Sequence, residues 1–267
     1  MKNFINEEKI SAILDDSQRG HSHHAESILK KALNLKGLSP EEAAILLNCE
    51  DDALLDRLYT TARQIKEEIY GKRLVLFAPL YLSNRCINSC SYCGFSHENT
   101  SSGKRLLEMQ EIRDETKALI SQGHKRLLLV SAEDPEVSID YLQDAIKTVY
   151  ETKEGNGAIR RINVNVAPME ESDFKKLKST GIGTYQSFQE TYHTDTYKQL
   201  HTSGPKSDYL KRLYACDNAQ SAGIDDVGIG ALFGLHDYKY EVLALLFHAI
   251  HLEEVFGVGP HTISVPR

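Results

Sequence analysis

The chain has 267 residues, a net charge of −7 at pH 7, and proportions of charged (26 %) and hydrophobic (41 %) residues that are normal for a soluble globular protein. The acidic balance gives no general attraction to nucleic acid or to an anionic membrane, and no apolar run reaches the roughly 18 residues that a membrane span needs. The N-terminus "MKNFINEEKISAILDD" lacks an apolar signal core, so we expect a cytoplasmic protein with no nucleic-acid or membrane partner.

The first part of the chain, residues 5–70, has the pattern of helices. "SPEEAAILL" begins with Ser39 as a helix cap, and "DDALLDRLYTTARQIKEEIY" has the spacing of a long amphipathic helix. We expect residues 1–71 to form a helical N-terminal extension. The histidines of "HSHHAE" are expected at a solvated helix start rather than in a metal site: His21, His23 and His24.

From residue 72 onwards apolar strand runs alternate with helical segments. The strand runs are "RLVLFAPLYLSN", "KRLLLVS", "RINVNVAP", "IGTYQSFQ", "IDDVGIGALFG" and "HTISVP". The helices between them are predicted near residues 106–122, 138–150, 171–179, 206–222 and 239–256. This alternation is typical of βα units that build a parallel sheet.

Six βα units in succession indicate an α/β fold of the TIM-barrel type over residues 72–267. An open, doubly wound sheet also fits the alternation, but no G-x-G-x-x-G follows the first strand to favour a dinucleotide fold. A complete barrel has about eight strands. We therefore expect a barrel that is incomplete at its C-terminus, in a chain that is part of a longer sequence.

Three of the five cysteines lie together in "RCINSCSYC", directly after the first strand. They are Cys86, Cys90 and Cys93, spaced C-x3-C-x2-C, at the end of the strand where barrel enzymes carry their functional groups. In the cytoplasm such clustered thiols are usually metal ligands or redox groups. Cys49 and Cys216 stand alone and are expected to be core residues.

Several kinds of site compete for this motif. A structural zinc site usually needs four ligands in two C-x2-C halves, and only one such half is present. A ferredoxin-type cluster needs a fourth cysteine nearby, and an isolated reactive thiol would not need three. The remaining interpretation is a [4Fe-4S] cluster held by three thiolates, with one iron open to a small ligand.

The motif, with an aromatic residue before its last cysteine (Cys86, Cys90, Tyr92, Cys93), resembles the signature of the radical S-adenosylmethionine (SAM) enzymes. The resemblance implies that the open iron of the [4Fe-4S] cluster binds the amino and carboxylate groups of SAM. Reduction by an external flavodoxin- or ferredoxin-type donor would then release a 5′-deoxyadenosyl radical. Tyr92 is the residue type that packs on the adenine in this family.

The resemblance also implies a residue for the SAM amino group after the second strand. There "VSAEDP" stands in the place of the family's Gly-Gly-Glu element, and only Glu133 matches, because Ser131 and Ala132 replace the glycines. A carboxylate is the right partner for an ammonium group. The alternative is an acidic helix cap before Pro135.

Further SAM contacts are implied around the fourth and fifth strands. Glu190, helped by Gln189, would accept hydrogen bonds from the ribose hydroxyls, and Arg212 would bind the SAM carboxylate. Gly228 and Gly230 in "VGIGALFG" would let the backbone approach the adenine. Without the resemblance, Arg212 would be read as a solvated residue on a helix.

Longer segments narrow the resemblance. "YLSNRCINSCSYCGF", "INVNVAPM", "GIGTYQSFQETYHTDTY", "HTSGPKSDY", "AGIDDVGIGALFGL" and "HLEEVFGVGPHTISVPR" resemble the aromatic amino acid lyase branch, and within it the tyrosine lyases that mature [FeFe]-hydrogenase (the HydG family). The resemblance implies cleavage of the Cα–Cβ bond of L-tyrosine to p-cresol and dehydroglycine. It also implies conversion to carbon monoxide and cyanide, with hydrogenase maturation proteins as partners. The tyrosine lyase of thiamine synthesis, 2-iminoacetate synthase, shares "ETYH" and is the alternative.

Two residues are candidates near the substrate. Tyr81 matches a tyrosine that lies close to the substrate in this branch, and the alternative is an ordinary aromatic residue at the barrel mouth. His193 is a candidate for proton transfer, and the alternative is a structural hydrogen bond.

One feature of the HydG family has no counterpart here. The family carries a second, C-terminal iron–sulfur cluster, and no cysteine follows Cys216 in this sequence. We expect that second cluster only in a longer form of the protein. A non-catalytic iron–sulfur scaffold is a further hypothesis, against which Glu133, Glu190 and Arg212 argue, because a scaffold needs no SAM contacts.

Overall fold

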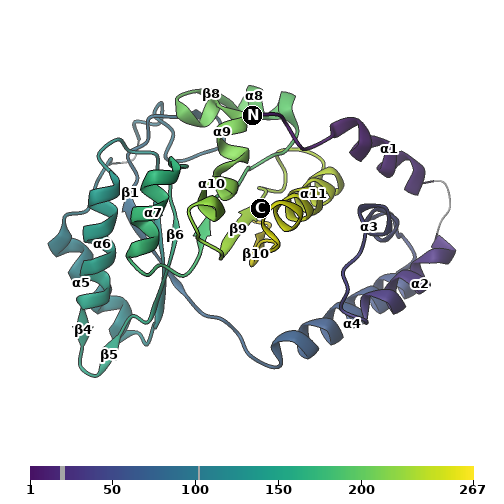
Figure 1. The fold of residues 1–267 in the computed structure, drawn as a ribbon, viewed down its shortest axis with the longest axis horizontal. Coiled ribbons are helices and arrows are strands. Elements are labelled where there is room, and N and C mark those ends of the chain that lie inside the picture. Colours follow the sequence, from purple (N-terminus) through teal and green to yellow (C-terminus); the bar gives the residue numbers. More distant parts are fainter. Residues whose placement is uncertain (19–21, 102) are drawn as a thin grey trace.

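The computed structural model describes residues 1–18, 22–101 and 103–267 (Figure 1). His21 lies outside these residues, and the side chain of His23 is not described, so the prediction for "HSHHAE" is not tested there. The helices are α1 (Glu7–Ser17), α2 (Ser22–Ala32), α3 (Pro40–Leu47), α4 (Asp52–Tyr70), α5 (Met109–Ser121), α6 (Ile139–Glu151), α7 (Glu171–Ser179), α8 (Thr194–Leu200), η1 (Pro205–Ser207), α9 (Tyr209–Leu213), α10 (Ala215–Ser221) and α11 (Tyr238–Phe256). The strands are β1 (Ala78–Ser83), β2 (Ser89–Cys90), β3 (Arg126–Ser131), β4 (Lys153–Glu154), β5 (Gly157–Ala158), β6 (Arg161–Asn165), β7 (Tyr185–Gln186), β8 (His201–Ser203), β9 (Val227–Gly230) and β10 (Thr262–Ser264).

Six strands form one parallel sheet in the order β1-β3-β6-β7-β9-β10. Each new strand lies beside the previous sheet strand in chain order, which is the winding of a βα barrel. A doubly wound sheet reverses its strand order at a switch point. The order therefore confirms the barrel-type fold and excludes the open alternative.

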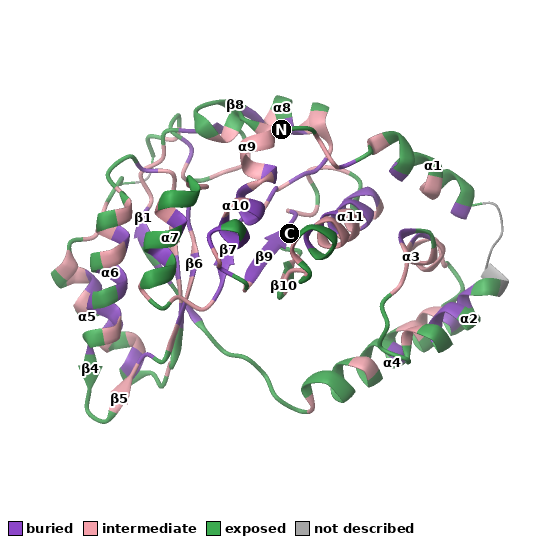
Figure 2. Cartoon of the chain, in the orientation of Figure 1, coloured by how far each residue is buried: buried purple, intermediate pink, exposed green. Residues whose placement is uncertain are grey.

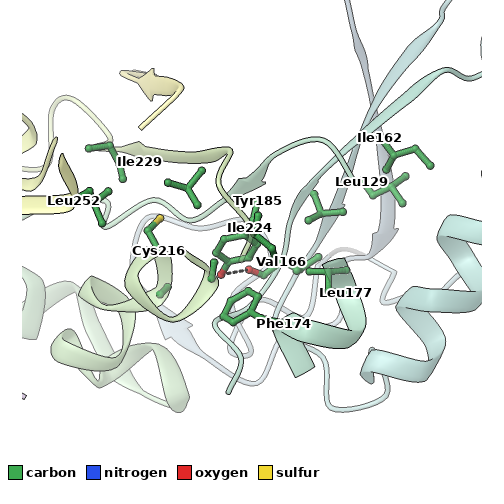
Figure 3. Packing of buried hydrophobic residues seen from close by; sticks show 14 of the residues in the cluster. Leu129, Ile162, Val166, Phe174, Leu177, Tyr185, Cys216, Ile224, Ile229 and Leu252 are labelled. Atoms are coloured by element: carbon green, nitrogen blue, oxygen red, sulfur yellow. Dashed lines mark hydrogen bonds between the residues drawn. The ribbon is translucent and has the colours of Figure 1, made fainter. Parts of the chain in front are cut away.

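The helices that follow the strands cover one face of the sheet, and the core lies between them (Figures 1 and 2). Figure 3 shows this layer, where Phe174 of α7 packs edge-on against Tyr185 of β7, with 4.7 Å between ring centroids. The Tyr185 hydroxyl donates to the carbonyl of Val166 at 3.3 Å. Cys216 of α10 is buried in the same layer, which confirms its prediction as a core residue.

Helices α1 to α4 form the N-terminal part, as predicted. Ser39 caps α3 in a capping box: its hydroxyl accepts from the Glu42 backbone N–H, and the Glu42 carboxylate accepts from the Ser39 backbone N–H. α1 and α3 pack against α11, and the Glu7 carboxylate accepts a hydrogen bond from the backbone N–H of Thr194. The division of the chain between residues 71 and 72 remains a proposal.

The structure differs from the predicted elements in several places, and it adds α8 and the short antiparallel pair β4–β5, which were not predicted. The helix predicted over residues 206–222 is divided into η1, α9 and α10, because Asp208 (φ −78°, ψ 95°) and Tyr214 (φ −88°, ψ 8°) leave the helical region. The short strands β2 and β8, which pair antiparallel, were not predicted. Among the described residues, no helix combines the length and hydrophobicity that crossing a membrane requires.

Candidate active site

The three clustered cysteines lie on a loop that leaves the carboxyl end of β1. Cys90 is buried in β2, which pairs with His201 of β8, while Cys86 and Cys93 are half-buried. Asp134 holds the start of the loop, because its carboxylate accepts a hydrogen bond from the hydroxyl of Ser83, the last residue of β1, at 2.7 Å. The cysteine loop is therefore fixed from both sides, by the end of β1 and by the pairing of β2 with β8.

The surroundings of the thiols suit metal-binding sulfur. The Asn88 amide N–H faces Cys86 Sγ at 3.5 Å, and the Phe95 backbone N–H donates to Cys93 Sγ at 3.4 Å. Burial raises the pKa of Cys90 to about 11, and the nearby Lys206 ammonium opposes that rise. Donors aimed at sulfur and a neighbouring cation stabilise thiolates.

No three His, Cys, Asp or Glu side chains among the described residues converge to hold a single metal ion. A tetrahedral zinc site requires such convergence, since all its ligands bind one ion at about 2.3 Å. In an iron–sulfur cluster each thiolate binds a different iron, so the ligands stand further apart. Three thiols on one loop, with N–H donors directed at the sulfurs of Cys86 and Cys93, fit an iron–sulfur cluster, which Cys86, Cys90 and Cys93 would hold.

Glu133 and Arg212 form a buried ion pair beside the cysteine loop. Arg212 Nη1 lies 2.8 Å from Glu133 Oε1, and the side chains are 9 % and 11 % exposed. Arg212 Nε also donates to the carbonyl of Phe188 at 2.8 Å. Burial disfavours the charged form of Arg212, but Glu133 and Glu190 keep its pKa above the usual value. The helix cap of α6 is Ser138, so Glu133 is not a capping residue.

Glu190 and Lys206 form a second pair at the same edge of the sheet. Lys206 Nζ donates to Glu190 Oε1 at 2.7 Å, with side chains 13 % and 15 % exposed. Burial acts to raise the pKa of Glu190, but Lys206 and Arg212 outweigh it and hold the pKa below its usual value. Glu190 therefore presents an ionised carboxylate in a largely dry position.

Tyr92 joins the cysteine loop to this second pair. Its hydroxyl lies 2.9 Å from His201 Nε2, and Lys206 Nζ lies 5.9 Å from the centre of its ring. Burial lowers the pKa of His201 to about 4, so the imidazole is neutral at pH 7. The aromatic face of Tyr92 thus lies beside both the cysteines and Lys206.

The structure gives the remaining predicted SAM contacts a mixed outcome. Gln189 is buried, and its Oε1 has no hydrogen-bond partner, so it keeps an unused acceptor. A Cβ on Gly230 would come within 2.7 Å of Phe188 and of the Ser264 carbonyl, and one on Gly228 within 2.9 Å of Gln186. Packing inside the sheet therefore already accounts for both glycines.

The two predicted substrate residues make their contacts with groups other than the two ion pairs. Tyr81 points from β1, is 51 % exposed, and packs edge-on against Phe95 with 5.9 Å between ring centroids. His193 caps α8, accepting from the Thr196 backbone N–H, and stacks on His236 at 4.0 Å. These contacts favour the structural hydrogen bond for His193 over proton transfer.

Three residues of this region were missed by the sequence reasoning. Lys206 lies in "GPKSDY", a segment that supported the resemblance without a role for its lysine. Asn88 donates to Glu133 Oε2 at 2.9 Å and accepts from the Lys206 backbone N–H at 2.8 Å. Asp134 also pairs with Arg85 at 3.2 Å. No spacing rule marks such residues, because their partners are distant in sequence.

A cavity of about 190 Å³ opens between these groups at the carboxyl ends of the strands. Ile87, Glu133, Lys206 and Arg212 are among its lining residues. A second cavity of about 280 Å³ shares part of this lining, including Asp134. Charges of both signs line the first cavity, so it suits a zwitterionic ligand.

Comparisons with known proteins agree with this geometry. Residues 80–248 match the family model described as the radical SAM superfamily. The chain is 32 % identical to 2-iminoacetate synthase of Escherichia coli K12 over 241 residues, which are 90 % of this chain and 62 % of that protein. The chain thus spans less than two thirds of the length of this relative.

Solved structures of HydG, described as a maturase of [FeFe]-hydrogenase, are also similar. One has a TM-score of 0.97 and 56 % identity, covering 100 % of this chain and 59 % of that one. The structure from Carboxydothermus hydrogenoformans has a TM-score of 0.90 and 45 % identity, covering 98 % and 60 %. Methylornithine synthase (PylB), at 24 % identity and a TM-score of 0.72, shares the fold.

Proposed function

The chain belongs to the radical SAM superfamily, and from that premise we propose that it is a lyase that cleaves the Cα–Cβ bond of L-tyrosine. The products would be p-cresol and dehydroglycine. The observation that carries the proposal is the buried Glu133–Arg212 pair beside the three-cysteine loop. The high identity with HydG and the identity with 2-iminoacetate synthase support tyrosine as the substrate.

The chain's own residues would bind SAM by exchanging ion-pair partners: Glu133 and Arg212 would release each other and pair with SAM. The amino acid end of SAM carries an ammonium and a carboxylate, which are opposite in sign to Glu133 and Arg212 respectively. Glu133 would take the ammonium and Arg212 the carboxylate, so that both buried charges stay paired. Asn88, which already donates to Glu133, would keep that carboxylate in place.

Glu190 would accept hydrogen bonds from the ribose hydroxyls, and Lys206 keeps it ionised for that role. Gln189 would help Glu190 at the ribose, and Tyr92 would pack on the adenine, with Gly228 and Gly230 of β9 allowing the backbone to approach it. Cys86, Cys90 and Cys93 would hold the [4Fe-4S] cluster. When bound, the cluster and SAM supply a 5′-deoxyadenosyl radical, given one electron from a flavodoxin- or ferredoxin-type donor.

We further propose a role in [FeFe]-hydrogenase maturation, with dehydroglycine leading to carbon monoxide and cyanide. The support is the identity with HydG over the whole of this chain. A second, C-terminal cluster would belong to a longer form of the protein. The second candidate function is a 2-iminoacetate synthase, favoured by the 32 % identity over 90 % of the chain. Tyr81, exposed on β1, stays a candidate for the substrate side.

The test is an anaerobic assay of the reconstituted protein with L-tyrosine, SAM and dithionite. We expect p-cresol and 5′-deoxyadenosine in parallel, with HydG from Carboxydothermus hydrogenoformans as the positive control. In a longer form of the protein that holds the second cluster, haemoglobin trapping of carbon monoxide and a cyanide assay separate the two candidates: p-cresol without carbon monoxide or cyanide favours the 2-iminoacetate synthase. A cluster that binds SAM without forming deoxyadenosine would favour the scaffold hypothesis and contradict the lyase.

A further inference from the structure

The turn that carries Glu190 has an uncommon backbone conformation. Glu190 has φ 68°, and Leu35 is the one other non-glycine residue with positive φ in the described part of the chain. The left-handed region is disfavoured for residues with a Cβ, because the side chain crowds the following carbonyl. Such a conformation persists only where the surrounding structure enforces it, and it is concentrated at ligand-binding sites.

The groups that enforce this turn come from two directions. On one side the Leu232 backbone N–H donates to the Glu190 carbonyl at 2.7 Å, just beyond β9. On the other side the two residues after Glu190 both donate to one carboxylate. The Thr191 hydroxyl donates to Glu241 Oε1 at 2.5 Å, and the Tyr192 backbone N–H donates to Glu241 Oε2 at 3.0 Å.

Thr191 extends this arrangement by one more residue. Its hydroxyl oxygen accepts from the His193 backbone N–H at 3.2 Å while its proton goes to Glu241. Three consecutive residues, Thr191 to His193, are thus fixed by one side chain of α11. Side-chain networks of this kind define a single geometry when all their members are paired.

Glu241 is itself an unusual residue for its position. It is completely buried among apolar neighbours on α11, and no ion pair is found for it among the residues that the structure describes. Burial raises its pKa to about 7, the bonds from Thr191 and Tyr192 oppose the rise, and Asp237 and Glu7 add to it. An unpaired buried acid is unfavourable for stability, so stability does not explain its presence.

We propose that Glu241 is a positioning residue that holds the Glu190 turn in its left-handed conformation, so that the Glu190 carboxylate faces the SAM ribose. The proposal rests on the proposed function of Glu190. Helix α11 contributes none of the predicted SAM contacts. Under this proposal it influences SAM affinity through the Glu190 turn. Lys206 cannot replace it, because Lys206 binds the Glu190 side chain and leaves the backbone unrestrained.

The test measures SAM binding to the anaerobically reconstituted protein by isothermal titration calorimetry, beside the melting temperature of the same samples. Thr191→Val removes the hydroxyl that bonds Glu241, and Thr191→Ser keeps it. Glu241→Gln replaces one carboxylate oxygen by an NH2 group. The side chain can then accept only one of the two hydrogen bonds that Thr191 and Tyr192 donate. We expect SAM to bind about tenfold more weakly in Thr191→Val and Glu241→Gln, and near the original affinity in Thr191→Ser.

The melting temperature separates positioning from stability. Glu241→Gln should melt at the same temperature or higher, since a buried charge is removed, while its SAM affinity falls. Leu252→Ala, a buried substitution on the same helix away from the turn, is the control. It should lower the melting temperature and leave SAM affinity unchanged.

Two further outcomes are distinguishable. If Glu190→Ala weakens SAM binding but Thr191→Val and Glu241→Gln do not, the positioning proposal is wrong and the proposed function stands. If Glu190→Ala itself leaves SAM affinity unchanged, the SAM role of Glu190 is wrong, and the positioning proposal falls with it.

Discussion

The cysteine loop, residues 86–93, and the Glu190 turn lie at the same edge of the sheet but are fixed in different ways. The loop is partly exposed and is held through the backbone pairing of β2 with β8 and through the Asn88 side chain, which donates to Glu133. The turn is buried and is held by charged groups, with Lys206 on the side chain and Glu241 behind the backbone.

The difference follows from what each region has to bind. Thiols that receive an iron–sulfur cluster from outside need access, so Cys86 and Cys93 are half-buried. The proposed contact of Glu190 with the ribose hydroxyls requires a carboxylate with a fixed direction, and the enclosure of Glu190 is consistent with that proposal. Substitutions on the two sides should therefore alter different measurements: metal content for the loop, and SAM affinity for the turn.

The largest expected effect is on the loop. Cys90→Ala should reduce iron from about four per chain to near zero after reconstitution, because Cys90 is the buried thiol of the three. Iron analysis and the visible absorbance of the cluster measure this. The control is Cys49→Ala, at a half-buried cysteine that packs against the small cluster of Ala25, Leu29 and Leu54, and it should keep its iron. Retention of a full cluster in Cys90→Ala would contradict the assignment of the loop.

The next effect is on the ion pair beside the turn. Arg212→Ala should weaken SAM binding about 10- to 100-fold, since a charged hydrogen bond contributes roughly 1.5–3 kcal/mol. The iron content should stay unchanged, and Arg160→Ala, at an exposed arginine, should change neither quantity. The EPR spectrum of the reduced cluster with and without SAM provides an independent measurement. An unchanged SAM affinity with a lowered melting temperature would assign Arg212 to stability alone.

Asn88 connects the two regions, and a substitution there should affect both measurements moderately. Its amide contacts Cys86 and Glu133, and its oxygen accepts from the Lys206 backbone. Asn88→Ala should weaken SAM binding by roughly threefold to tenfold, as expected for one or two uncharged hydrogen bonds, and should make the cluster more labile to a chelator. An effect on one measurement only would show that the two regions are independent.

The smallest expected effect is a pH dependence of stability. The pKa of His248, which bonds the Tyr192 hydroxyl behind the turn, is lowered to about 3 by burial. The unfolded chain binds this proton near pH 6.5 and the folded chain does not, so stability falls as the pH drops below about 6.5. His201, behind the loop, acts in the same direction. Glu241, with its raised pKa, acts in the opposite direction between about 4.5 and 7.

His248→Gln in the protein without its cluster should reduce the loss of melting temperature between pH 7 and pH 5 by about 2–4 °C. Its matched control is His97→Gln, at an exposed histidine. The melting temperature of this variant should fall between pH 7 and pH 5 as much as that of the original protein. An unchanged acid sensitivity in His248→Gln would show that His248 does not titrate on unfolding.

The features that the sequence predicted well are those with a short-range signal. The spacing of apolar residues along the chain distinguishes strands from helices and so predicts their alternation. The structure confirms six parallel strands in chain order. The cysteine motif is contiguous, so its loop was identified at once. Glu133, Glu190 and Arg212 were named from the resemblance and not from a local pattern; the structure pairs Glu133 with Arg212 and Glu190 with Lys206, and their role toward SAM stays a prediction.

The features that were missed depend on partners distant in sequence. β2 and β8 have two and three residues, too few for a strand pattern, and each exists only because the other is present. Glu241 stands in the first turn of a helix, where an acid is normally solvated and favoured by the helix dipole. The sequence around Glu241 has no feature that distinguishes it from an exposed residue, and only the packing of α11 shows that it is buried.

The β2–β8 pairing also has a consequence for the order of events during synthesis. The hydroxyls of Ser89 and Ser203, which bond each other across this pairing, are separated by 114 residues. At about 5–20 residues per second, a ribosome needs roughly 6 to 23 seconds between making the first and the second. For that interval the nascent chain displays its cysteines without the strand that encloses Cys90. Iron delivered before β8 is made would bind thiols that are not yet enclosed and can be oxidised. We therefore expect iron and sulfide to be inserted after translation.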